Sequence, residues 1–186
     1  THGTDSSDYY PFYSLKSDYG WEDLYNLIDT LNNFPDSVEQ VLNVDRTLWM
    51  HAINYSLINF DSYIGYAQNY YLYKDRTKQF NPILWDFNMS FGGFRLTDAS
   101  QLYFNGFDIT QAQEMDPLVH YNLISVSPRP LMRNLFSSER NRKMYLAHIR
   151  TIMEENFVNQ DYFVRGQFLQ NLIDQDVQND INKFYS

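Results

Sequence analysis

The chain has 186 residues and a formal net charge of −9; 44% of its residues are hydrophobic and 18% are aromatic. This length fits one domain with a sizeable core, and the composition is typical of a globular protein. The negative charge argues against broad nucleic-acid binding, and the absence of cysteine excludes disulfides, thiolate metal sites and cysteine nucleophiles. No apolar run approaches the length needed to span a membrane.

Helices are predicted over much of the first third of the chain. Residues 1–10 are polar and predict a loose lead-in. Apolar residues spaced by three and four predict a helix over 21–32, which Pro35 ends, and a short helix follows over 37–42. The segment 45–59 is apolar almost all round, which is typical of a helix buried in the middle of a domain.

Two short segments after these helices predict an antiparallel β-ribbon. Residues 70–73 are rich in aromatic residues that favour strands, and residues 80–85 form a second apolar run. The polar residues 74–79 between them have the length of a hairpin loop.

Three polar side chains flank this ribbon. Asp61 comes just before it, Asn69 begins it and Asp86 follows it directly. Because the two ends of a hairpin lie together, we expect these side chains to converge. Two carboxylates and an amide oxygen are ligands that suit a hard divalent cation. We also expect the buried helix over 45–59 to mount Asp61 on a rigid element.

The rest of the chain is predicted to be largely helical. Residues 94–114 are expected to be irregular, and a short helix is predicted over 117–124. Two longer helices close the chain, one over 138–156 and one that begins near residue 160. The predicted fold class is therefore mainly α (α+β): a single helical domain over 1–186 with one small antiparallel β-ribbon.

Several motifs in this sequence resemble those of the CotH (spore-coat protein H-like) kinase family, a group of atypical, mostly extracytoplasmic kinases. The matching segments are Asp61-Ser62-Tyr63, Asn69-Tyr70-Tyr71-Leu72-Tyr73, Trp85-Asp86-x-x-x-Ser90-Phe91-Gly92, Asp116-Pro117-Leu118 and Arg142-Lys143-Met144-Tyr145. The resemblance implies the C-terminal lobe of an atypical kinase domain, without the N-terminal lobe that clamps the nucleotide.

The same resemblance implies an activity and the residues that perform it. The expected reaction transfers phosphate from ATP, with Mg²⁺ or Mn²⁺, to Ser or Thr of secreted or surface proteins, in a bacterial, extracytoplasmic setting. Asp61 would be the catalytic base, and Asp86 and Asn69 would bind the metal and nucleotide. Members of the family often have a second aspartate where this chain has Asn88, so Asn88 is expected to be a weakened metal ligand.

Each of these residues also has a structural interpretation. Asp61 could be a turn or cap residue, and so could Asn69. Asp86 stands between Trp85 and Phe87, where burial among apolar neighbours would make an unpaired carboxylate costly; this favours the metal interpretation.

Other functions stay open at this point. A non-catalytic extracellular module for adhesion, Ca²⁺ or glycan binding is one alternative, and a glycosidase that uses Asp61 and Asp86 is another. No Walker-type loop is present. The segment 129–150 holds five arginines and one lysine against the single acid Glu139, which predicts either a solvated helix surface or a face that binds phosphate or an acidic substrate.

Overall fold

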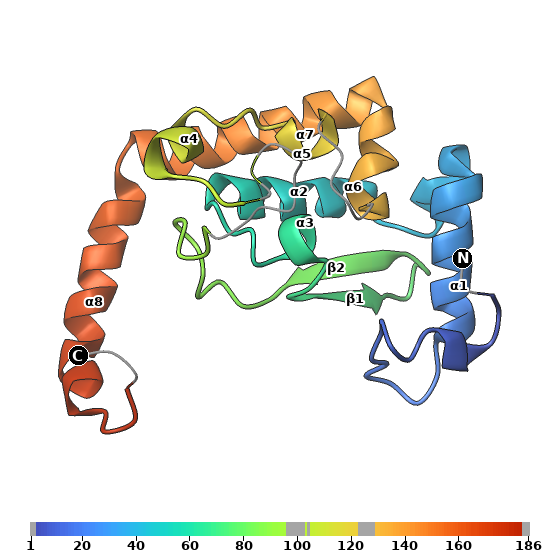
Figure 1. The fold of residues 1–186 in the computed structure, drawn as a ribbon, viewed down its shortest axis with the longest axis horizontal. Coiled ribbons are helices and arrows are strands. Elements are labelled where there is room, and N and C mark those ends of the chain that lie inside the picture. Colours follow the sequence, from blue (N-terminus) through green and yellow to red (C-terminus); the bar gives the residue numbers. More distant parts are fainter. Residues whose placement is uncertain (1–2, 96–102, 104, 123–128, 184–186) are drawn as a thin grey trace.

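A computed structural model of the protein describes residues 3–95, 103, 105–122 and 129–183 (Figure 1). It confirms the predicted class, because the chain is mainly helical with one small two-stranded antiparallel sheet of β1 (Tyr70–Lys74) and β2 (Phe80–Leu84). The helices in chain order are η1 (Ser6–Asp8), α1 (Trp21–Asn33), η2 (Pro35–Gln40), α2 (Val44–Ser56), α3 (Tyr63–Tyr66), α4 (Ile109–Gln113), α5 (Val119–Asn122), α6 (Pro130–Arg133), η3 (Leu135–Ser137), α7 (Glu139–Ile152), the π-helix η4 (Met153–Val158) and α8 (Asp161–Asn179).

Helix α2 occupies the middle of the domain, as the continuous apolar pattern predicts. It packs against α7 and against β2 (Figure 1). Leu48 and Ala52 are fully buried there, and so is His51. At the surface, Trp49 stacks on His148 of α7 with ring centroids 4.0 Å apart. Helix α2 is therefore the central element, with α7 and β2 packed against it.

The β-ribbon forms as predicted. Tyr70 pairs with Leu84 and Lys74 with Phe80, which fixes the register of the two strands. The hairpin loop is closed by Asp75, whose carboxylate accepts hydrogen bonds from the side chain of Thr77 and from the backbone N–H of the same residue. These bonds, the side-chain bond first, hold the pKa of Asp75 below its usual value.

The segment predicted to be a loose lead-in is exposed over most of its described residues but is anchored near its end, where Tyr9 and Tyr10 contact α1. The Tyr9 ring is almost fully buried and lies 4.8 Å from the Tyr25 ring, centroid to centroid. Its hydroxyl donates to the Gly3 carbonyl at 2.8 Å. The polar composition of residues 1–10 did not indicate this contact, because a single buried aromatic side chain can hold a short segment that is otherwise polar.

The segment 94–114, expected to be irregular, contains helix α4. Asp108 and Gln111 form a reciprocal capping box at its start, in which Gln111 N–H donates to the Asp108 carboxylate and Asp108 N–H to the Gln111 amide, each at 2.8 Å. Residues 96–102 and 104 of this segment lie outside the described residues. The short helix expected over 117–124 is observed as α5.

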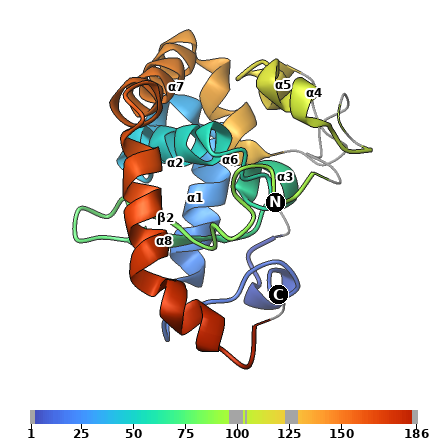
Figure 2. The same cartoon turned by 90° about the vertical axis from the view of Figure 1, so that its left-hand side faces the viewer.

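The two closing helices are joined by a π-helical turn. Helix α7 passes into η4, and the left-handed Gln160 (φ 62°) then starts α8 in a new direction (Figure 2). Apolar residues of α8 remain exposed, including Leu172 at 65%. None of the described helices combines the length and the apolar character that a membrane crossing requires.

Candidate active site

A buried loop between α2 and α3 positions Asp61. Phe60, directly before it, is fully buried, and so is Asn59. The backbone N–H of Asn59 donates to the Asn54 carbonyl at 2.8 Å, and its side-chain amide donates to the Asn54 side chain at 3.1 Å. Ser62 on the other side of Asp61 donates its hydroxyl to the Asn59 carbonyl at 2.6 Å. Asp61 is thus held from both sides by a tight, internally hydrogen-bonded turn.

The buried helix predicted over 45–59 to deliver Asp61 is shorter than expected. Helix α2 ends at Ser56, because the chain turns at Leu57 and takes positive φ at Ile58 (49°). Asp61 caps neither helix, since the C-cap of α2 is Leu57 and the N-cap of α3 is Ser62; it lies in a turn, which the structural interpretation also allowed. Rigidity comes from the buried loop instead of from an extended helix.

A glycine allows this loop to fold back on α3. An added Cβ at Gly65 would lie 2.0 Å from the carbonyl oxygen of Phe60. No side chain fits in that space, so close backbone contact between α3 and the residue before Asp61 requires glycine.

The carbonyl end of α3 is held by Arg129, from a distant part of the sequence. Its Nε donates to the carbonyls of Tyr63 and Ile64 at 3.0 and 3.2 Å, and Nη2 donates to the Gly65 carbonyl. Desolvation lowers the pKa of this half-buried guanidinium, while the Tyr63 hydroxyl opposes that effect. A cation at a helix C-terminus is favourable. The sequence showed Arg129 only as part of a basic segment.

Hydrogen bonds join Asp61 to the start of the ribbon. The side-chain nitrogen of Asn69 donates to the Asp61 backbone carbonyl at 2.7 Å and to its carboxylate at 3.2 Å, and the Gln68 amide donates to the other carboxylate oxygen. Asn69 has φ 56°, a left-handed conformation that asparagine tolerates well. These bonds use the amide nitrogen of Asn69; the amide oxygen is the atom that a metal would bind.

Asp86 lies at the same end of the ribbon. Tyr70 is opposite Leu84, so the residue before β1 and the residues just after β2 leave the sheet together. Asp86 has φ 55°, and its carboxylate accepts a bond from the Asn88 backbone N–H at 3.4 Å. Asn88 itself is exposed in the following turn. Convergence of the side chains on one bound ion stays a prediction.

The expected burial of Asp86 is wrong. Its side chain is exposed, and the neighbouring Trp85 is 55% exposed. Trp85 and Phe87, the two apolar neighbours, indicated a buried environment. However, one face of a two-stranded ribbon is exposed to solvent, and Asp86 follows the end of β2 in an exposed position. The Asp86 carboxylate is therefore accessible to a ligand. Because it is not buried, the cost of burying an unpaired carboxylate no longer supports a bound metal.

The number and type of these donors decide which metal ion they could serve, if they met at one point. Within the part of the chain that the structure describes, no three His, Cys, Asp or Glu side chains gather in a group able to hold a metal ion. Mg²⁺ commonly takes one or two carboxylates and completes its octahedron with phosphate oxygens and water, whereas Ca²⁺ takes about six to eight oxygens. Asp86 with the Asn69 oxygen, and Asn88 as a neutral neighbour, resembles the first pattern.

An exposed aromatic face borders these residues; the sequence indicated exposed tyrosines but not that they form a face beside the candidate residues. Tyr71 and Trp85 contact each other edge to face, with ring centroids 5.4 Å apart. They are 37% and 55% exposed, and Tyr73 and Ile83 continue the same outer face at 59% and 47%. The alternation of β1 was the available signal, because residues 71 and 73 point away from the core.

These features describe a mainly helical domain in which Asp61 and Asn69 are hydrogen-bonded at the end of a β-ribbon. The family model described as CotH kinase protein matches residues 1–186, and the chain belongs to this family. The resemblance seen in the sequence motifs is thereby confirmed over the whole chain. Searches of curated proteins and of solved structures returned no match.

Proposed function

We propose that this chain carries the phosphate-transfer site of an ATP-dependent protein kinase. The observation that supports this most directly is the pairing of Asp61 with Asn69 at the ribbon end from which Asp86 also emerges. A base, a neutral metal ligand and an acidic metal ligand are the side chains that phosphoryl transfer requires of this part of a kinase. Membership of the CotH kinase family supports the same reaction.

Asp61 has the role of the base. Two side-chain amides, from Gln68 and Asn69, donate to its carboxylate and fix its orientation. A carboxylate held in this way accepts hydrogen bonds only, so it can orient an acceptor hydroxyl and take its proton as the phosphate is transferred.

Asp86 and Asn69 hold the nucleotide's metal. Asp86 and Asn69 would supply oxygen ligands to Mg²⁺ or Mn²⁺, and a metal held there would neutralise charge on the phosphates during transfer. Asn88 stands where a second carboxylate would bind the ion more strongly, so the site relies on the nucleotide for its remaining ligands. We expect metal and ATP to bind together, each strengthening the other.

The exposed aromatic pair beside this site provides a surface for the adenine base. Stacking of a base on an aromatic side chain contributes about 1–3 kcal/mol. Tyr71 and Trp85 are already in contact and exposed, so little reorganisation is needed for a flat ring to pack against them.

The acceptor in this proposal is a Ser or Thr hydroxyl of a secreted or surface protein, and the setting is extracytoplasmic. Both follow from the resemblance to the kinase family.

The test combines nucleotide binding with phosphate transfer. Mg·ATP binding is measured by calorimetry and incorporation of labelled phosphate by autoradiography, for wild type, Asp61→Asn, Asp86→Ala and Asp174→Ala. Asp174 is an exposed acid of α8 and gives a control with the same loss of charge. We expect Asp86→Ala to weaken Mg·ATP binding and abolish transfer. Asp61→Asn is expected to keep binding and to slow transfer about 10²–10⁴-fold. Equal incorporation by wild type and Asp86→Ala would contradict the proposal.

The aromatic face also favours a second candidate, a glycan-binding adhesion module, because exposed tyrosine and tryptophan rings stack on sugars. This candidate predicts glycan affinity that Trp85→Ala removes and Asp86→Ala leaves intact. Loss of Mg·ATP binding in Asp86→Ala would instead favour the kinase.

A further inference from the structure

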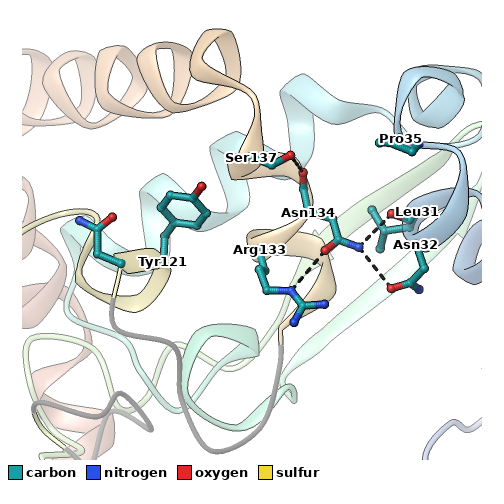
Figure 3. Close-up of a pocket in the computed structure, with 8 residues that line it drawn as sticks. Leu31, Asn32, Pro35, Tyr121, Arg133, Asn134 and Ser137 are labelled. Atoms are coloured by element: carbon teal, nitrogen blue, oxygen red, sulfur yellow. Dashed lines mark hydrogen bonds between the residues drawn. The ribbon is translucent and has the colours of Figure 1, made fainter.

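A hollow of about 580 Å³ lies between the end of α1 and helices α5 and α6, which are different elements from those that carry Asp61 and Asp86 (Figure 3). Its volume suits a small organic molecule or a short peptide segment. The lining residues are Leu31, Asn32, Pro35, Tyr121, Asn122, Arg133, Asn134 and Ser137.

One wall of this pocket is fixed by hydrogen bonds. The Asn134 side chain donates to the Leu31 carbonyl at 2.9 Å and to the Asn32 side-chain oxygen at 3.2 Å, and Ser137 donates its hydroxyl to the Asn134 carbonyl at 2.6 Å (Figure 3). These bonds connect α1 to α6 and η3. The wall is therefore formed before any ligand arrives, and its own amide donors are used internally.

The charge of the pocket is positive on an acidic protein. Arg133 is the charged member of the lining set, which contains no carboxylate among the residues that the structure describes. Its Nε is 3.4 Å from the Asn134 side-chain oxygen, a long hydrogen bond, and its guanidinium projects at the rim in Figure 3. In the described residues no acid forms an ion pair with Arg133. By contrast, Arg140 pairs with Glu39 at 2.8 Å and Lys143 with Glu139 at 2.7 Å.

A second guanidinium lies against the Tyr121 ring. The Cζ atom of Arg142 lies 5.5 Å from the centre of that ring, within the range of a cation–π contact. The ring of Tyr121, together with Leu31 and Pro35, gives the pocket apolar surface beside its cation. A ligand that matches both parts carries an oxyanion next to an apolar group.

We propose that this pocket binds a carboxylate or phosphate group that is attached to an apolar part, with Arg133 as its charged partner. The shared chemistry is an organic oxyanion, which an acidic peptide or a free anion can supply. This assigns a function to part of the basic segment 129–150 and does not depend on the kinase reaction.

The test uses the full chain and three probes: an acidic tripeptide, Ac-Leu-Glu-Leu-NH₂, its neutral counterpart Ac-Leu-Gln-Leu-NH₂, and inorganic phosphate. Affinity is measured by NMR titration, with the side-chain amide signals of Asn122 and Asn134 as local reporters. We expect the acidic peptide to shift these signals and the neutral peptide to leave them in place. Arg133→Gln should weaken binding about tenfold, the loss of one charge-assisted hydrogen bond.

Arg140→Gln is the matched control, because it removes the same charge from an arginine that already has an acid partner. We expect it to bind the acidic peptide as wild type does. Phosphate that shifts the same signals as strongly as the acidic peptide would show that the apolar part adds nothing to binding, and would overturn the proposal. Equal binding of the acidic and neutral peptides, or equal binding by the two arginine variants, would overturn the proposal.

Discussion

Replacing Gly65 by alanine should destabilise the loop that carries Asp61. The new Cβ would lie 2.0 Å from the Phe60 carbonyl oxygen, whereas close carbon–oxygen contacts in proteins are about 3.3 Å. Relief requires a movement of about 1.3 Å. The Phe60 side chain is fully buried and Arg129 holds the Gly65 carbonyl, so neither side of the contact moves freely. We expect the free energy of unfolding to fall by about 3 kcal/mol, at the upper end of overpacking costs.

The assay is urea unfolding of Gly65→Ala beside Gly166→Ala. Gly166 lies inside α8, where an added Cβ meets nothing within 4 Å. The same chemical change there should raise the unfolding free energy by about 0.5–1 kcal/mol, because alanine loses less backbone entropy in a helix. A Gly65→Ala protein as stable as wild type would refute the argument that close backbone contact fixes this loop.

Three further predictions concern acid stability, the metal and the nucleotide. Burial lowers the pKa of His51 from 6.5 to about 4, so the unfolded chain binds more protons between those values; stability should be complete above pH 6.5 and fall by about 3 kcal/mol as the pH drops to 4. Urea unfolding at several pH values checks this, and an unchanged slope in His51→Gln would contradict it. Asn88→Asp should strengthen Mg²⁺ binding in the presence of ATP, because it adds a carboxylate beside Asp86; calorimetry that shows weaker or equal binding would remove Asn88 from the site. Trp85→Ala should weaken ATP binding about tenfold with little effect on stability, since the side chain is 55% exposed; unchanged ATP affinity would exclude stacking on this ring.

The sequence predicted the elements that local patterns determine. The continuous apolar pattern of α2 and the two aromatic strands were visible because helical and strand periodicities depend on neighbours a few residues away. The position of Asn69 and Asp86 at one end of the ribbon followed from hairpin geometry alone, and the register of Tyr70 with Leu84 agrees with it.

Features that depend on distant contacts could not be predicted in this way. Helix α3 has four residues, too few for a periodic pattern, and its end is held by Arg129. The exposure of Asp86 depends on which face of the ribbon packs against α2, and the burial of Tyr9 depends on its contact with Tyr25. The family motifs identified the candidate residues, but they did not predict the solvent exposure of each side chain.

The hold of Arg129 on α3 has a consequence for dissecting this domain. Asp61, Asn69 and Asp86 lie within a short stretch of sequence, yet the guanidinium that stabilises the adjoining helix comes 64 to 66 residues after its acceptors. A polypeptide ending at Asn122 would keep each of the three side chains and lose that support. Deletion mapping would then report inactivity for a fragment that retains every residue of the proposed chemistry.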